Sequence, residues 1–230
     1  RCRNRAMSSA GERLPVVVLI SGRGSNLRSI ANEARAATSP VEIRAVVSDR
    51  ADAAGLEWAR GTGLHCVVLS PKQFPDRARY DEALAALVAS FDPGLVVLAG
   101  FMRILGPAFV DRFADRMLNI HPSLLPRHRG LDTHRRVLES GEREHGASVH
   151  FVTRELDGGP VVIQARVPVR DDDDEASLAE RVLHLEHRIY PQAVGWFAAG
   201  RLRCVEGTAW LDGRPLDQPV QVGAADEAPG

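Results

Sequence analysis

Continuous apolar runs alternate with amphipathic stretches along the first 120 residues. The apolar runs are short and rich in Val, Leu and Ile, which is typical of strands buried on both faces of a sheet. The stretches between them have the spacing of helices with one buried face. Strands that alternate with helices predict an α/β fold, with a doubly wound, mostly parallel, Rossmann-like sheet. The predicted strands are 14–22, 41–49, 65–70, 93–101 and 116–121, and the predicted helices are 25–37, 53–63, 76–91 and 107–113.

The pattern changes after residue 130. Two alternating segments joined by a Gly-rich turn predict an antiparallel hairpin, 146–153 with 159–169, added to the sheet as a C-terminal extension. A long amphipathic helix over 175–200 and a small hairpin over 202–213 follow it. We therefore expect one domain over 14–213, with a disordered N-terminal extension (1–13) and a flexible C-terminal tail (214–230).

Composition narrows the possible classes of protein. The 230 residues are 44% hydrophobic and 26% charged, with a formal net charge of −1. A nearly neutral chain is a poor partner for nucleic acid, and no apolar run has the length needed to cross a bilayer. The three cysteines are far apart in the sequence, which fits reduced thiols in a cytoplasmic protein rather than disulfides or a zinc site.

Ligands of such sheets bind beyond the carboxyl ends of the strands. "SGRGSNL" (21–27) follows the first predicted strand and opens a helix. Glycines there allow close backbone approach, and the N–H groups of a first helical turn favour a phosphate. The alternative is a tight turn in which Ser25 is only a helix N-cap.

Apolar residues occupy a second strand end, where a loop would usually be polar. "AGFMRILGP" (99–107) contains Phe101, Met102, Ile104 and Leu105. Such a segment either fills the core or lines a pocket for a flat aromatic ligand.

Asn119 and His121 leave the predicted strand 116–121 with their side chains on the same side. An amide that stabilises an oxyanion beside an imidazole that relays a proton suits acyl transfer. Asp157 lies on the Gly-rich turn of the predicted hairpin, and a carboxylate close to His121 would raise the imidazole pKa. The alternatives are a strand cap, a histidine bound to a carbonyl, and an ordinary Asp-Gly turn.

Five segments taken together resemble the phosphoribosylglycinamide formyltransferase family, within the formyl-folate transferases and hydrolases. They lie in the family's order and spacing, and the similarity runs from about residue 14 to about 213. The segments are "LISGRGSNL" (19–27), "VVLAGFMRIL" (96–105), "LNIHPSLLP" (118–126), "EHGASVHFVT" (144–153) and "ELDGGP" (155–160).

The resemblance implies transfer of the formyl group of 10-formyltetrahydrofolate to the amine of glycinamide ribonucleotide, in de novo purine synthesis and without a metal. It implies small-molecule substrates, no nucleic acid or membrane partner, and a monomer or homodimer. It also implies a catalytic trio, Asn119, His121 and Asp157, in which Asp157 orients or charges His121 and takes the proton of the amine. The implied contacts to the ribonucleotide are Gly24, Ser25, Asn26 and Glu186. The implied contacts to the folate are Arg77, Met102, Arg103, Ile104, Leu105 and Asn119.

One segment departs from the family pattern. "RHRGLDTH" (127–134) replaces the aromatic or Pro that the family commonly has before Gly. We expect this change to alter the loop without touching the catalytic trio. His134, His145 and His150 are candidates for contacts behind the reacting groups.

Three other functions compete with the transferase. A 10-formyltetrahydrofolate hydrolase is expected to carry a regulatory domain before the first strand, and a methionyl-tRNA formyltransferase a basic C-terminal domain. The third is a phosphate-binding module without catalysis. Turnover of a formyl folate that requires glycinamide ribonucleotide would separate all three from the transferase.

Overall fold

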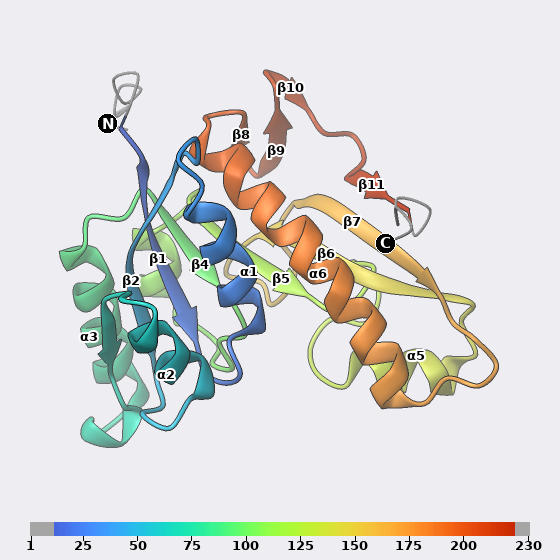
Figure 1. Cartoon of the computed structure of the whole chain (residues 1–230), viewed down its shortest axis with the longest axis horizontal. Helices are drawn as coiled ribbons and strands as arrows, with labels where there is room; N and C mark the ends of the chain where they lie inside the picture. The colour runs from blue at the N-terminus through green and yellow to red at the C-terminus, as the bar shows by residue number, and fades with distance from the viewer. Residues whose placement is uncertain (1–11, 224–230) are drawn as a thin grey trace.

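A computed structural model describes residues 12–223 and has an eight-stranded mixed sheet at its centre (Figure 1). The strands lie in the order β11-β7-β6-β5-β4-β1-β2-β3. Their bounds are β1 Leu14–Ile20, β2 Val41–Ser48, β3 Cys66–Val68, β4 Leu95–Leu98, β5 Met117–His121, β6 Glu144–Phe151, β7 Val161–Pro168 and β11 Val220–Val222. The α/β fold expected from the sequence is confirmed.

The first five strands of the sheet are parallel to one another, whereas β6 is antiparallel to both β5 and β7. The hairpin predicted after residue 130 is thus part of the main sheet. Strand β1 lies between β2 and β4, so the chain leaves the centre in one direction through β2 and β3 and in the other through β4 and β5. Such a reversal places a crevice at the carboxyl ends of the central strands.

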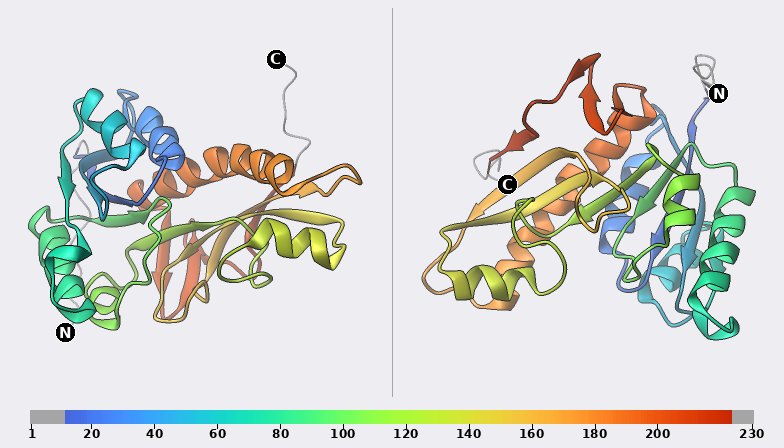
Figure 2. Two further views of the ribbon diagram at one scale, coloured as in Figure 1. Left: turned by 90° about the horizontal axis from the view of Figure 1, so that it is seen from below. Right: turned by 180° about the vertical axis from the view of Figure 1, so that it is seen from behind.

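Helices cover both faces of the sheet, and alternate residues of β1 explain why (Figure 2). Val16, Val18 and Ile20 belong to one core cluster, with side chains from α1, α2 and α6. Val17 and Leu19 belong to a second cluster, with α3 and α4. The helices are α1 Ser25–Ala34, α2 Ala54–Gly61, α3 Arg77–Ser90, α4 Pro107–Arg112, α5 Thr133–Ser140 and α6 Glu175–Ala198, with a 3-10 turn at Pro71–Gln73.

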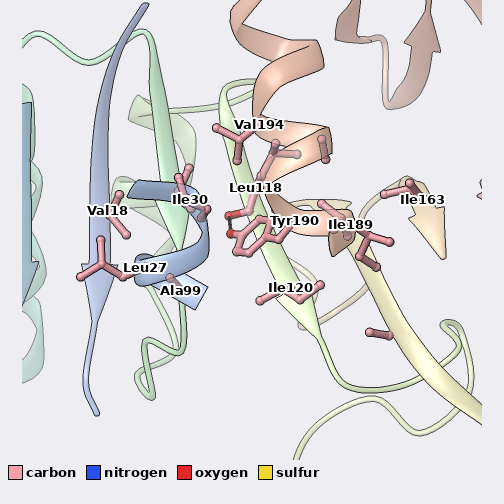
Figure 3. Close-up of a cluster of buried hydrophobic side chains, with 14 of the residues drawn as sticks. Val18, Leu27, Ile30, Ala99, Leu118, Ile120, Ile163, Ile189, Tyr190 and Val194 are labelled. Carbon is pink, nitrogen blue, oxygen red and sulfur yellow. Dashed lines mark hydrogen bonds between the residues drawn. The ribbon is translucent and has the colours of Figure 1, made fainter. Parts of the chain in front are cut away.

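Helix α6 runs across the sheet (Figure 1) and contacts its central strands. It begins at a capping box in which Asp174 and Ser177 exchange hydrogen bonds. Further along, the fully buried Tyr190 hydroxyl lies 2.9 Å from the carbonyl oxygens of both Leu98 in β4 and Leu118 in β5. Figure 3 shows Tyr190 beside Leu118 and among apolar side chains from β5 and α6.

The predicted ends of the domain need correction. Arg13, placed by the sequence in a disordered extension, donates hydrogen bonds to the carbonyls of Ala34 and Ala36. The expected flexible tail from residue 214 is wrong for 214–223: β10 (Arg214–Pro215) joins the hairpin of β8 (Leu202–Val205) and β9 (Thr208–Leu211), and β11 pairs with β7. The rest of the two predicted termini, 1–11 and 224–230, lies outside the described residues.

Candidate active site

Three loops meet at one edge of the sheet, because β1, β4 and β5 are adjacent and parallel. The loops after β1 and β4 bind each other directly. The Ser21 amide donates to the Gly100 carbonyl at 3.1 Å, and the Ser21 hydroxyl accepts from the Met102 amide at 2.9 Å. The candidate phosphate loop and the candidate folate segment are therefore held side by side.

Gly24 shapes the loop after β1. It is the N-cap of α1 with φ 71°, and a Cβ at this position would lie 2.6 Å from the Gly55 Cα. Ser25 is already the first helical residue, so the alternative in which Ser25 is the N-cap is wrong. Gly24 has no side chain with which to cap this helix, which leaves the first-turn N–H groups available to an anion.

Asn26 and Glu186, 160 residues apart in the sequence, meet beneath this loop. The Asn26 Nδ2 donates to the Glu186 Oε2 at 2.6 Å, and both side chains are buried. Burial raises the pKa of Glu186 to about 7, against the opposing effect of the hydrogen bond from Asn26. The Asn26 Oδ1 is buried without a partner in the described part of the chain, and a buried amide oxygen in that state is suited to accept from a ligand.

The segment after β4 alternates exposed and covered side chains. Met102 and Ile104 are 74% and 61% exposed, whereas Leu105 packs against the second core cluster. Arg103 stacks over the Tyr80 ring, with its guanidinium 5.0 Å from the ring centroid. Arg77 donates to the Ile104 carbonyl at 2.7 Å. The structure thus brings Arg77 to the segment 102–105 and leaves two apolar side chains of that segment uncovered.

The residues of the expected catalytic trio lie together although Asp157 comes from the turn between β6 and β7. The Asp157 Oδ2 lies 3.5 Å from the His121 Nδ1 and accepts from the Gly130 amide at 2.9 Å. Both side chains are only 8% exposed. Asn119 lies two residues before His121 in β5.

His150 joins this group from β6, where it pairs with Asn119 across the antiparallel ladder. Its Nδ1 lies 2.8 Å from the Phe151 carbonyl, which can only accept, so the proton is on Nδ1. The His150 Nε2 is then the acceptor for the Asn119 Nδ2 at 3.1 Å, and it lies 3.6 Å from the Asp157 Oδ1. One N–H of the Asn119 amide is held in this way, and the other, with no partner among residues 12–223, remains for a ligand. This contact depends on the register between β5 and β6, which no local sequence motif specifies.

Asp157 raises the pKa of His121 as expected, but the net change in that pKa is a decrease. Burial lowers the pKa of His121 and outweighs the opposing effects of the His128 carbonyl and of Asp157. Asp157 behaves differently: burial raises its pKa, but the close contact with His150, the hydrogen bond from the Gly130 amide and the nearby imidazoles bring the net pKa below its usual value. The resting pair is therefore a neutral imidazole beside a carboxylate.

The expectation that the loop 127–134 leaves the trio untouched is also wrong. The His128 carbonyl accepts from the His121 Nε2 at 2.9 Å, and the Gly130 amide binds Asp157. The His121 proton is therefore on Nε2, and Nδ1 faces the carboxylate. His134 and His145 instead bind each other, with 3.0 Å between the His134 Nδ1 and the His145 Nε2.

The fold and the site together define a class of protein, a Rossmann-like acyl-transfer enzyme with an amide, an imidazole and a carboxylate at the strand ends. The chain belongs to the formyl transferase family, whose sequence model matches residues 14–194. It is 53% identical over 212 residues to the phosphoribosylglycinamide formyltransferase of Escherichia coli (strain K12), covering 92% of this chain and 99% of that one. The Haemophilus influenzae enzyme of the same name is 43% identical over 201 residues, covering 87% and 95% of the two chains.

A solved structure agrees with the sequence comparisons. The phosphoribosylglycinamide formyltransferase of Coxiella burnetii superposes with a TM-score of 0.87 at 48% identity and covers 91% of this chain and 99% of that one. The resemblance inferred from the sequence motifs is confirmed. No helix among residues 12–223 is long and apolar enough to cross a membrane. The expected location, oligomeric state and metal independence stay predictions.

Proposed function

We propose that this chain transfers the formyl group of 10-formyltetrahydrofolate to the amine of glycinamide ribonucleotide, giving formylglycinamide ribonucleotide and tetrahydrofolate in purine biosynthesis. The relatives that carry this activity in their names match nearly the whole chain. The observation that carries the proposal for this chain is the buried His121 imidazole 3.5 Å from the Asp157 carboxylate, with Asn119 two residues before it in β5.

The phosphate of the ribonucleotide would bind the N-terminus of α1 at Gly24, Ser25 and Asn26. The Asn26–Glu186 pair would then meet the polar groups of its sugar or glycinamide. The pterin would lie on the exposed side chains of Met102 and Ile104, with Arg77 and Arg103 beside it. Two substrates held in this orientation gain a rate advantage on the order of 7–11 kcal/mol in favourable cases.

The amine nitrogen attacks the formyl carbon and forms the new N–C bond, and the carbonyl oxygen becomes an oxyanion. The free N–H of Asn119 donates to that oxyanion. The His121 Nδ1 takes the proton that the amine loses, directly or through one water, and returns a proton to N10 of the folate as its bond to carbon breaks. Asp157, 3.5 Å away, stabilises the imidazolium formed in between.

This proton path differs from the one implied by the resemblance, in which Asp157 takes the proton. A carboxylate whose pKa is lowered is a weak base, whereas burial keeps His121 neutral with a free lone pair on Nδ1. Asp157 therefore acts through charge rather than as the proton acceptor.

The test is formyl transfer measured by conversion of 10-formyltetrahydrofolate with and without glycinamide ribonucleotide. We expect conversion only with the ribonucleotide, and conversion at background level for His121→Ala. Conversion that is equally fast without the ribonucleotide would identify a hydrolase instead. Binding of the ribonucleotide with no turnover above the His121→Ala level would leave only a binding module.

A further inference from the structure

The loop 127–130 binds both members of the His121–Asp157 pair through its backbone. The His128 carbonyl accepts from the His121 Nε2 at 2.9 Å, and the Gly130 amide donates to the Asp157 Oδ2 at 2.9 Å. The first contact selects the His121 tautomer, because a carbonyl pairs only with a protonated nitrogen. A small displacement of this loop would therefore change which nitrogen of His121 is free.

The loop is held from outside the site by Glu142, which follows α5. Its Oε1 lies 2.6 Å from the His128 Nε2, and its Oε2 accepts from the Arg127 Nη1 at 2.7 Å. One carboxylate thus binds two successive residues of the loop. The side chains of His128 and Glu142 are 13% and 24% exposed, so this contact is more shielded from solvent than an ordinary surface ion pair.

His128 needs such support because its backbone has φ 52°. Residues other than Gly, Asn and Asp adopt this left-handed conformation at a cost. The same conformation sets where the His128 carbonyl lies, and the Ser123 hydroxyl further fixes the loop by donating to the Arg127 carbonyl at 2.7 Å.

We propose that Glu142 and His128 are positioning residues for the formyl transfer: Glu142 binds the His128 side chain, which holds the His128 carbonyl against the His121 Nε2 and so keeps the His121 Nδ1 free beside Asp157. The inference rests on the proposed function for the catalytic role of His121. The link itself, from Glu142 to the tautomer of His121, is a property of the resting protein. Neither residue touches the reacting atoms, so both act through His121.

Kinetics of two variants test the link. Glu142→Ala removes the anchor, and His128→Asn keeps a residue that tolerates φ 52° but is too short to reach Glu142. For each we expect kcat to fall roughly tenfold, the size expected when one orienting hydrogen bond is lost, with both KM values within about twofold of the parent enzyme. The double variant should lose no more than either single one, because the two residues act as a unit.

Glu139→Ala is the matched control. Glu139 is an exposed acid on α5 whose only ion pair among the described residues is a 3.9 Å contact to Arg135, and its loss should leave kcat and both KM values unchanged. Parental kcat in Glu142→Ala or in His128→Asn would overturn the proposal. A parallel rise in both KM values at unchanged kcat would also overturn it, because that result indicates general disturbance of the substrate sites.

A measurement without turnover separates this inference from the proposed function. Nitrogen-15 spectra of the free protein report the tautomer of His121. We expect Nε2 protonated and Nδ1 bare in the parent, and a substantial Nδ1-protonated fraction in Glu142→Ala. An unchanged tautomer would overturn the inference even in an active enzyme. A shifted tautomer in a protein that transfers no formyl group would support the inference and refute the function.

Discussion

The burial of Glu186 makes a prediction about stability that substrate assays alone would not give. Its carboxyl has an ordinary pKa of 4.5, and burial raises the pKa to about 7 in the folded protein. The folded state therefore holds a proton more tightly than the unfolded state does, so stability falls as pH rises between these two values. The difference corresponds to about 3 kcal/mol, from 1.36 kcal/mol for each factor of ten.

Glu186→Gln should abolish this loss. Glutamine keeps an oxygen that can accept from the Asn26 Nδ2, which now lies 2.6 Å from the Glu186 Oε2, but it carries no charge at any pH. We expect the variant and the parent to have similar free energies of unfolding near pH 4. Near pH 8 the variant should be more stable by about 3 kcal/mol.

Urea unfolding at several values between pH 4 and pH 8 measures the difference directly. The parent should lose stability relative to the variant across this interval, most steeply between pH 5 and pH 7. Equal dependence on pH in the two proteins would refute the reasoning, because it would mean that the folded protein holds Glu186 with an ordinary pKa. The variant should also bind glycinamide ribonucleotide more weakly, so that a more stable protein is a poorer enzyme.

Three further substitutions test the site and its support. Asp157→Asn should lower kcat by roughly 10²-fold or more while both substrates still bind, since it removes the charge that stabilises protonated His121. Stopped-flow and steady-state kinetics measure both effects, and loss of binding at unchanged kcat would contradict that role. Gly24→Ala should raise the KM for the ribonucleotide and destabilise the fold by more than about 1 kcal/mol, because its Cβ would lie 2.6 Å from the Gly55 Cα. An unchanged KM in the same assay and an unchanged free energy of unfolding in urea would contradict this prediction. Tyr190→Phe should lower the free energy of unfolding in urea by about 1–2 kcal/mol, since the hydroxyl contacts two buried carbonyls. Both KM values should stay unchanged, and a variant as stable as the parent would contradict the prediction.

Periodicity along the chain predicts the parallel half of the fold because both faces of β1 and β4 are largely buried, so their apolar runs are continuous, and β2 is buried in the same way from Ala45 onward. It misses β11, which is only three residues long and acquires its partners from β7 across 50 or more residues of sequence. A strand of that length carries no periodic signal. Its definition depends on the partner strand.

The site divides in the same way. Motifs place Asn119 and His121 at a strand end, where parallel topology alone brings loops together. Motifs do not show that His150 lies opposite Asn119, because that contact depends on the register between β5 and β6. Nor do they give the sign of the pKa change of His121, which depends on how deeply the ring is buried rather than on the presence of Asp157. Neither the register between the strands nor the depth of burial can be read from the positions of residues along the sequence.

Strand β11 has a consequence for the solution behaviour of the protein. It covers the outer edge of β7, and Gln221 accepts from the Arg166 side chain at 2.9 Å. An uncovered strand edge presents backbone groups that pair readily with another chain. A cut in the segment that leads into β11, before Val220, would release this strand and uncover the edge of β7. We expect such a cut to leave the catalytic edge of the sheet intact and to make the protein self-associate more as its concentration rises.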